Sequence, residues 1–393
     1  MIREAQCPNC GGKGLAPFYS SEAIPVHSCM MFDDAESAAA FPKRDLVLGF
    51  CRQCGFISNV VFDPTVQDYA TGYEEQQSFS PHFRAFQTRL CESLIEKYEI
   101  RGKDVVEIGC GKGDFLIELC ERGENRGVGI DPTCDPDRIE GRGDGRVRFV
   151  KSYYSREHAD LPCDVLCCRH TLEHIHQTAE FVAQVRTVIG DREDTLVFFE
   201  VPAVERVLNE GAFWDVYYEH CAYFSLGSLA RLFRSQRFDL FELEMDFDDQ
   251  YLLIVARPSA MPTKPAWSSE DDLARLEADV DHFRKTVTAR IADWRQRFES
   301  WNIENKRVAI WGSGSKCVSF LSAVGTQENV SAIVDINPFR QGKVLVGWGH
   351  RIVAPESLCQ APPDVVVVMN PIYCAEIQRD LESMGLDAEL VTV

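Results

Sequence analysis

The chain has 393 residues, 45% of them hydrophobic, and carries a formal net charge of −20 at pH 7. This length predicts two to three domains with sizeable cores, and the acidic balance disfavours nucleic acid and anionic membranes as partners. The N-terminal segment has no apolar secretory core, and no apolar run approaches the roughly 20 residues that span a bilayer. We expect a cytoplasmic protein whose 16 cysteines are metal ligands and buried thiols rather than disulfides.

Two CxxC pairs come first along the chain, Cys7 with Cys10 and Cys51 with Cys54. Four thiolates in two such pairs can close a tetrahedral zinc site, and a closed site supports structure rather than chemistry. The long interval between the pairs indicates an inserted subdomain. We expect a structural zinc ion here, against two alternatives: four ordinary buried cysteines, or a redox-active pair. His27, which lies in the interval, is left out of the ligand set.

The stretch DVVEIGCGKGDFL (104–116) predicts a strand with Glu107 near its end, then a tight turn and a helix. The turn holds Gly109, Gly111 and Gly113, whose missing side chains let the backbone adopt positive φ and approach a ligand. It meets a helix N-terminus, which suits polar ligand groups. By itself such a turn is also compatible with a dinucleotide-binding oxidoreductase.

Short apolar runs then alternate with helical segments, which predicts a doubly wound α/β unit. The run GVGID ends in Asp131, well placed for a ribose diol, and the run DVLCC is followed by Arg169. Together with the glycine turn, these features resemble the class I S-adenosylmethionine (SAM)-dependent methyltransferases. The resemblance implies that Glu107 and the turn face the methionine part of SAM and that Asp131 binds the ribose hydroxyls. Arg169 is also included among the expected cofactor-binding residues.

A proline-bearing linker at 259–267 precedes a helix whose apolar residues recur every three or four positions. Ser268 is its expected N-cap, and the helix should pack across two domains or against a second subunit. A second α/β pattern then begins with RVAIWGSGS. The predicted fold class is therefore α/β, with a zinc-binding N-terminal domain (1–80), a Rossmann-like SAM-binding methyltransferase domain (81–258), a linker with the long helix (259–300) and a second, C-terminal Rossmann-like domain (301–393).

The segment RHTLEHIH places His170, Glu173 and His174 in the H-x-x-E-H pattern of inverted zinc proteases. It follows directly on a core strand of the α/β unit. In class I methyltransferases that loop lies over the methyl donor and the substrate. We therefore set the metalloprotease interpretation aside and expect His174 to contact the substrate, with His176 as a surface histidine.

The stretch DVYYEHCAYFS (215–225) places Glu219 and His220 in an aromatic run that is expected to be buried. One interpretation is a structural histidine, and the other is an acid/base group in a dry pocket. The full order is zinc pairs, SAM fold, Tyr-x-Glu-His stretch, long helix and second α/β unit. That order resembles the sugar C-methyltransferases, which methylate carbon 3 of nucleotide-linked 4-keto-deoxysugars, over essentially the whole chain.

This resemblance implies a set of catalytic residues, with His220 as the base. Carbon methylation requires a base for the proton beside a ketone and donors for the enolate oxygen, and imidazole and tyrosine hydroxyls suit these tasks. The other implied residues line the pocket or lie near the sugar: Tyr217, Glu219, His174 and Tyr73, with Tyr69 as the alternative to Tyr73.

Two segments depart from the sugar-modifying members of the family. The segment YEEQQSFSPHF adds two glutamates and two glutamines to the expected polar lining, and the third domain reads WGSGSKCVSF. There, Gly312, Gly314 and Lys316 could cradle a diphosphate at a helix N-terminus, with Asp335 and Asn370 ending the following strands. A purely scaffolding third domain is the alternative.

These features predict SAM-dependent C-methylation next to the ketone of a nucleotide-linked keto-deoxysugar, through a base-generated enolate. The main alternative is O- or N-methylation of another small-molecule natural-product intermediate. An RNA methyltransferase and a non-catalytic SAM- or nucleotide-binding regulator are further alternatives. The expected cofactors are SAM and structural Zn²⁺, and the expected partner is a small-molecule acceptor. The identity of the acceptor and the oligomeric state are left open.

Overall fold

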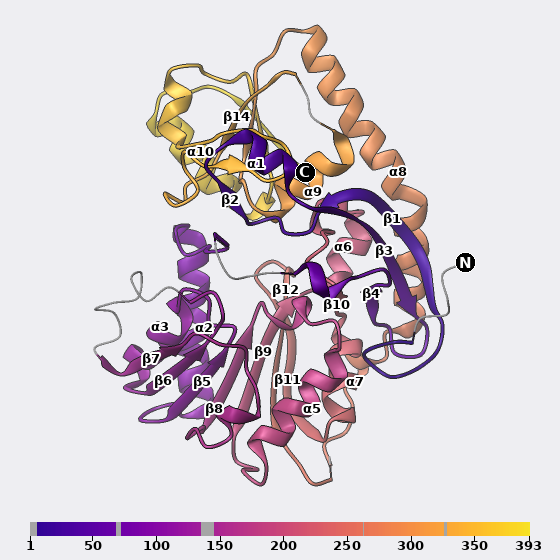
Figure 1. Ribbon diagram of the computed structural model, residues 1–393, viewed down its shortest axis with the longest axis vertical. Helices are drawn as coiled ribbons and strands as arrows, with labels where there is room; N and C mark the ends of the chain where they lie inside the picture. The colour runs from indigo at the N-terminus through magenta and orange to yellow at the C-terminus, as the bar shows by residue number, and fades with distance from the viewer. Residues whose placement is uncertain (1–5, 68–71, 135–144, 262, 326–327) are drawn as a thin grey trace.

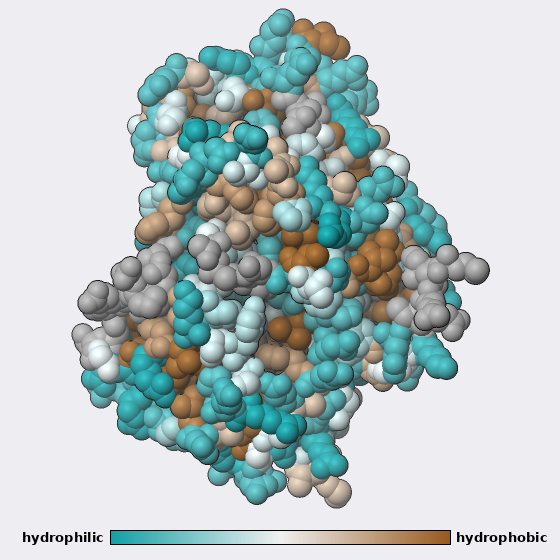
Figure 2. Space-filling view, viewed as in Figure 1, coloured by the Kyte–Doolittle hydropathy of each residue, from teal (hydrophilic) through white to brown (hydrophobic). Residues whose placement is uncertain are grey.

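The computed structural model describes residues 6–67, 72–134, 145–261, 263–325 and 328–393. Figure 1 shows a large sheet below, a smaller α/β block above, and a curved N-terminal hairpin beside a long helix along one side. The face in Figure 2 is mostly hydrophilic, with apolar residues gathered at mid-height, between the upper and lower blocks. None of the helices in the described ranges is both long and apolar enough to cross a bilayer.

The large sheet has seven strands in the order β11-β12-β9-β8-β5-β6-β7. The pairs from β9 to β7 are parallel, and β12 is antiparallel to both of its neighbours. This is the doubly wound α/β unit that the alternating apolar runs predict. Its strands are β5 (Asp104–Ile108), β6 (Arg126–Ile130), β7 (Val147–Val150), β8 (Val165–Arg169), β9 (Leu196–Pro202), β11 (Phe238–Asp246) and β12 (Tyr251–Pro258).

Helices cover both faces of this sheet because its central strands are apolar on both sides. Along β8, Val165 and Cys167 pack with α2 and α3, whereas Leu166 and Cys168 pack with α5 and α7. The helices of this block are α2 (Pro81–Tyr98), α3 (Asp114–Gly123), α5 (Thr178–Ile189), α6 (Val204–Glu210) and α7 (Leu226–Ser235).

The N-terminal block is an antiparallel sheet in the order β1-β3-β4-β10. Its last strand comes from the aromatic stretch in the middle of the chain, and the short strand β2 pairs with β15 of the C-terminal block. The N-terminal block is thus hydrogen-bonded to both other blocks. Its elements are β1 (Leu15–Pro25), β2 (Met31–Phe32), α1 (Ala35–Ala40), β3 (Lys43–Cys51), β4 (Ile57–Asn59) and β10 (Ala222–Tyr223).

The C-terminal block is a five-stranded parallel sheet in the order β16-β14-β13-β17-β18. Its glycine-containing loop leads from β13 into α9, as the glycine turn of the large sheet leads from β5 into α3. The elements are β13 (Val308–Trp311), α9 (Ser315–Val324), β14 (Val330–Val334), β15 (Val344–Leu345), β16 (Ile352–Val353), β17 (Val365–Val368), α10 (Cys374–Ser383) and β18 (Glu389–Thr392).

The long helix α8 (Leu273–Ile303) packs against α6, α9 and β1, and so against all three blocks. One apolar cluster accordingly joins Val207, Phe283 and Phe320. This is the packing across domains that was the first of the two arrangements predicted. The N-cap prediction was wrong: Ser268 lies in a separate 3₁₀ turn (Ser268–Glu270), and the residue that precedes α8 is Asp272.

Candidate functional site

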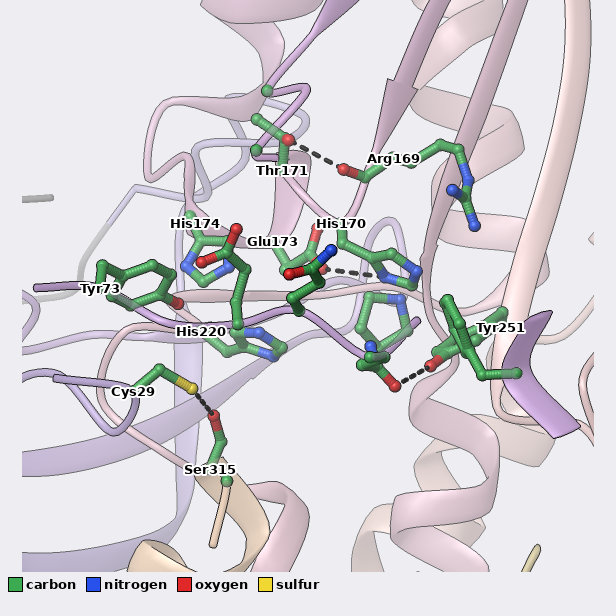
Figure 3. A pocket seen from close by; sticks show the side chains of 18 of the residues that line it. Cys29, Tyr73, Arg169, His170, Thr171, Glu173, His174, His220, Tyr251 and Ser315 are labelled. Atoms are coloured by element: carbon green, nitrogen blue, oxygen red, sulfur yellow. Dashed lines mark hydrogen bonds and ion pairs between the residues drawn. The ribbon is translucent and has the colours of Figure 1, made fainter. Parts of the chain in front are cut away.

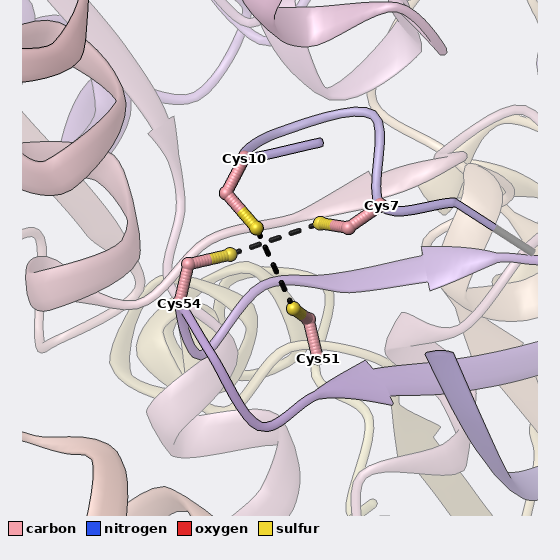
Figure 4. A group of neighbouring side chains, drawn as sticks. All are labelled: Cys7, Cys10, Cys51 and Cys54. Atoms are coloured by element: carbon pink, nitrogen blue, oxygen red, sulfur yellow. Dashed lines mark hydrogen bonds between the residues drawn. The ribbon is translucent and has the colours of Figure 1, made fainter. Parts of the chain in front are cut away.

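The four predicted metal ligands come together at the base of the β1–β3 hairpin (Figure 4). The Sγ atoms of Cys7 and Cys54 are 3.7 Å apart, as are those of Cys10 and Cys51. Four sulfurs bonded to one zinc ion at about 2.3 Å would be roughly 3.8 Å apart in a tetrahedron. The backbone N–H of Gly12 also points to the Cys10 sulfur at 3.4 Å. The spacing of the cluster therefore fits a closed, four-thiolate metal site.

The glycine turn between β5 and α3 is built around backbone conformations that favour glycine. Gly109 has φ +69°, and a Cβ placed there would lie 1.9 Å from the Thr171 Oγ1 atom. Gly113 has φ +79° and is closely covered by the Phe149 ring. A side chain at Gly109 would thus be both strained and blocked, so the sequence GxGxG fixes the shape of this loop.

Two carboxylates flank the turn, as expected for SAM binding. The Glu107 side chain is buried, its Oε2 atom has no hydrogen-bond partner among the described residues, and burial raises the pKa of this carboxyl to about 8. Asp131 accepts hydrogen bonds from the N–H of Gly111 at 2.9 Å and of Thr133 at 2.6 Å. The Oδ1 atom of Asp131 also accepts from the Thr133 hydroxyl, so a further lone pair remains on its Oδ2 atom, and Glu107 retains an unused acceptor. These residues fit the cationic amino group and the ribose hydroxyls of SAM.

Arg169, at the end of β8, lines the same cavity but is already paired. Its Nε atom is 2.6 Å from Glu200 Oε2, and its guanidinium lies over the Phe115 ring at 4.3 Å. His170 Nε2 is 2.9 Å from the other Glu200 oxygen. Burial opposes a charged imidazole, but Glu200 and Glu173 outweigh it and raise the pKa of His170 to about 9. The positive charges of this network balance the negative charge of Glu200, which stays ionised. Direct contact of Arg169 with SAM stays a prediction.

Glu75 is a residue near the turn that the sequence did not single out as a site residue. Its Oε1 atom would be 2.8 Å from a Cβ at Gly111, and its Oε2 atom lies 3.8 Å from Lys112 Nζ. Although 32% of the side chain is exposed, burial of the carboxyl raises its pKa to about 7. The only sequence signal was the unusual run of polar residues in YEEQQSFSP.

A cavity of about 760 Å³ lies where the three blocks meet, and the glycine turn opens into it. Four of the predicted catalytic residues line it: Tyr73, His174, Tyr217 and His220. In Figure 3, the Tyr73 hydroxyl points toward the two histidines. Tyr69, the alternative to Tyr73, lies outside the described residues.

His220 is buried at the centre of this aromatic wall. Its ring centroid lies 4.2 Å from that of Tyr217 and 4.7 Å from that of His174. Burial lowers the pKa of His220 well below its usual range, and positive charge in the surrounding residues, including His170 and Lys316, lowers it further. Within the described part of the chain, no hydrogen bond involves the His220 imidazole. It is therefore a neutral ring whose nitrogens are available to a ligand in the cavity.

Glu219 does not line the cavity, in contrast to the prediction. Residues 218–219 form a turn, so Tyr217 and His220 on either side of it meet, while Glu219 points away. Its carboxylate accepts hydrogen bonds from His27 Nδ1 at 3.0 Å and from the Ser28 N–H at 3.1 Å, and it also contacts the Ser28 hydroxyl. Burial raises the pKa of Glu219, but the contacts with His27 and Ser28 outweigh burial and hold the pKa below its usual range.

His174 is oriented by the backbone of the same turn. Its Nδ1 atom lies 3.1 Å from the carbonyl oxygen of Glu219. Because a carbonyl only accepts, Nδ1 carries the proton and Nε2 carries the lone pair. The 218–219 turn thus fixes one histidine through its backbone and braces the N-terminal block through the Glu219 side chain.

The C-terminal block contributes the opposite wall of the cavity, including Gly312, Gly314, Lys316, Asp335 and Asn370. Ser315 joins this wall to the N-terminal block through contacts with Ser28 at 2.8 Å and Cys29 at 3.3 Å (Figure 3). Lys316 forms an ion pair with Asp215 of the large block. Asp335 accepts hydrogen bonds from the Ser313 N–H and hydroxyl.

Comparison with known proteins supports the same assignment over most of the chain. A family model described as "Methyltransferase domain" matches residues 82–243, and one described as "C-methyltransferase C-terminal domain" matches residues 267–391. The C-methyltransferase NovU of Streptomyces niveus is 26% identical over 95% of this chain and 91% of NovU. The chain belongs to a family of SAM-dependent C-methyltransferases.

Two other similarities of this C-methyltransferase cover smaller shares of the chain. Ribosomal protein L11 methyltransferase of Yersinia pestis is 26% identical over 26% of this chain and 36% of that protein. The structure of the 1,6-didemethyltoxoflavin-N1-methyltransferase of Burkholderia thailandensis covers 44% of this chain and 78% of its own, with 20% identity and a TM-score of 0.35. The strand order and glycine turn described above give this C-methyltransferase the class I fold.

Proposed function

We propose that this C-methyltransferase forms an enolate from a nucleotide-linked keto-deoxysugar and methylates the carbon next to the ketone. The observation that carries the proposal is the convergence of His220, His174, Tyr73 and Tyr217 on the cavity that the glycine turn enters. The similarity to NovU, itself named a C-methyltransferase, supports carbon as the methylated atom.

His220 is the proposed base. A carbon beside a ketone loses its proton only to a well-placed acceptor, and a neutral imidazole provides one. The Tyr217 ring packs against His220 and limits the orientations of the imidazole. The surrounding apolar and aromatic wall keeps water from competing for the enolate.

The enolate oxygen requires hydrogen-bond donors that reach it in the same cavity. The Tyr73 hydroxyl is the proposed donor, because it points into the space between the two histidines. His174 would contact the sugar through Nε2. This atom carries the lone pair, because Nδ1 donates its proton to the Glu219 carbonyl. Glu219 is a positioning residue in this scheme, since its carboxylate faces the N-terminal block.

Glu107, Asp131 and the glycine turn are the residues that would hold SAM. When bound, SAM supplies an electrophilic methyl group. The unused acceptor of Glu107 would receive the cationic amino group, and the remaining lone pair of Asp131 Oδ2 would accept from a ribose hydroxyl. The Thr171 side chain closes over Gly109 and fixes the loop before any ligand arrives.

The C-terminal wall is the proposed site for the nucleotide part of the acceptor. Gly312 and Gly314 precede α9, whose N-terminal N–H groups suit a diphosphate. The buried Arg340 also lines this wall and donates to the Ser313 hydroxyl at 3.3 Å. Lys316 contributes less positive charge than its position suggests, because Asp215 is paired with it.

The cysteine cluster is assigned to a structural Zn²⁺. It ties Cys51, at the end of β3, to the loop before β4, and β4 pairs with Ala222 and Tyr223. Those residues directly follow the His220 segment. A filled cluster would therefore brace the catalytic stretch from outside the cavity.

The test is to incubate the enzyme and methyl-labelled SAM with a panel of nucleotide-linked 4-ketosugars and matched non-sugar ketones. The account predicts a new methyl group bonded to the carbon next to the sugar ketone, located by mass spectrometry and NMR. The product should be absent with His220→Asn and present with His176→Asn, since His176 does not line the cavity. Methylation of an oxygen or nitrogen would refute the enolate and support the alternative.

A further inference from the structure

Within the described residues, the three side chains of the H-x-x-E-H motif do not form a metal-binding group by themselves. His170 turns toward Glu200, with its Nε2 atom 2.9 Å from that carboxylate. Glu173 and His174 remain beside His220, which comes from a different loop. Ligand atoms from these three side chains all lie within 4.8 Å of one another. The cluster is thus formed by the fold, since His220 replaces the first histidine of the sequence motif.

Each of the three side chains has the state that a metal ligand requires. Glu173 is 1% exposed, its Oε1 atom lies 3.7 Å from His170 Nδ1, and its Oε2 atom has no hydrogen-bond partner in the described ranges. No hydrogen bond in the described ranges involves the imidazole of His220, which is 8% exposed and lines the cavity. His174 donates through Nδ1 to the Glu219 carbonyl, which is the outer contact that metal-bound histidines commonly make.

The donor set limits the kind of cation. Two imidazoles and one carboxylate suit divalent transition metals such as Zn²⁺, Co²⁺ and Ni²⁺, whereas Mg²⁺ and Ca²⁺ prefer oxygen alone. Donors at about 2.0–2.1 Å from zinc are roughly 3.4 Å apart in a tetrahedron, so the side chains must approach one another by up to about 1.4 Å from their present limit. The cavity leaves the remaining coordination position open to a ligand.

We infer that Glu173, His174 and His220 form a second metal site, which takes a divalent transition-metal ion in the catalytic cavity (Figure 3). The ion bonds to the imidazole lone pair that would otherwise accept the substrate proton. Occupancy therefore blocks the enzyme reversibly. The blocking rests on the proposed function of His220, but the binding does not.

The binding test uses Co²⁺ on the full chain, after the cysteine cluster has been filled with Zn²⁺ and loosely held metal has been removed. The expected result is one further equivalent of Co²⁺ with weak visible bands and no thiolate charge-transfer band. Glu173→Gln keeps the shape of the side chain but removes the anionic ligand. Loss of a direct ligand should weaken binding at least as much as the roughly 10–100-fold cost of disturbing an outer-shell partner.

His220→Asn should also lose the second Co²⁺, and His176→Asn should keep it, because His176 does not line the cavity. Binding confined to the cysteine cluster, or a second equivalent unchanged in Glu173→Gln, would overturn the site. In a separate arm, Zn²⁺ should stop substrate deuterium exchange and a chelator should restore it. Exchange that continues with the second site filled would overturn the blocking. If no ketone exchanges even without metal, the proposed function fails, while the Co²⁺ titration still decides the site.

Discussion

Replacing Glu219 by Gln tests whether this carboxylate braces the catalytic turn from outside the cavity. Its two oxygens receive three donors: His27 Nδ1 and the N–H and hydroxyl of Ser28. A glutamine has the same shape but presents one acceptor oxygen and one NH₂ group. The NH₂ group must then face either Ser28, where a buried donor loses its acceptor, or His27, whose imidazole must change tautomer so that Nδ1 accepts. In both cases the hydrogen bonds lose their charged partner.

A hydrogen bond to a charged group is stronger than a neutral one by about 1 kcal/mol, and the Glu219 carboxylate receives three donors. Glu219→Gln should therefore reduce the local stability of this contact by about 1–3 kcal/mol. Glu205→Gln is the matched control, because that buried carboxylate accepts one N–H, from Leu226, and lies 3.6 Å from Arg275, while its Oε2 atom has no hydrogen-bond partner in the described part of the chain. Its cost should be below about 1 kcal/mol.

Native-state hydrogen exchange at the Ser28 amide is the appropriate assay, since a chain with several domains need not unfold in one step. In Glu219→Gln, the opening free energy at Ser28 should fall by the predicted amount, while amides of β17 keep their protection. A double-mutant cycle with His27→Gln should show coupling of at least about 0.5 kcal/mol. An unchanged Ser28 amide, or additive effects with His27→Gln, would refute the bracing role.

Three further predictions follow from the cysteine cluster and the SAM loop. Cys51→Ser should lose the bound zinc, measured by elemental analysis, whereas Cys359→Ser, at an exposed cysteine of the C-terminal block, should retain it. Because burial raises the pKa of Glu107 to about 8, the free enzyme holds this proton at pH 7, and a cationic ligand expels it. SAM binding should release up to about one proton, measured by calorimetry in two buffers, and the contribution of Glu107 should tighten binding as pH rises toward about 8 and level off above it; proton uptake would contradict this. Gly109→Ala should weaken SAM binding at least tenfold (about 1.4 kcal/mol), whereas Gly102→Ala, also at positive φ but with open space around it, should not; equal effects would show that the Thr171 contact is irrelevant.

The fold and the SAM loop could be predicted because their signals are local. Alternating apolar runs and the spacing of Gly109, Gly111 and Gly113 reflect backbone requirements within a few residues. The cysteine pairs are similar, since each CxxC loop presents its two thiols together. The N-cap of α8 failed because Ser268 and Asp272 are both plausible caps in sequence, and only the preceding 3₁₀ turn separates them.

The direction of side chains across the blocks could not be predicted. Glu219 and His220 are adjacent, but the turn at 218–219 sends one to His27 and the other into the cavity. The partners involved, His27 and Ser28, lie far away along the chain in an apolar N-terminal segment that carries no motif. Similarly, the sequence predicts that Lys316 is available to bind phosphate, but the fold places Asp215 beside it in an ion pair.

In the proposed mechanism, His220 removes a proton from the carbon next to a ketone. The most direct measurement is deuterium exchange at that carbon in heavy water, with S-adenosylhomocysteine in place of SAM so that no methyl group is transferred. The account predicts exchange by the wild type and by His176→Asn, and exchange slower by roughly 10²–10⁴-fold in His220→Asn. Wild-type exchange rates in His220→Asn would contradict the assignment of the base.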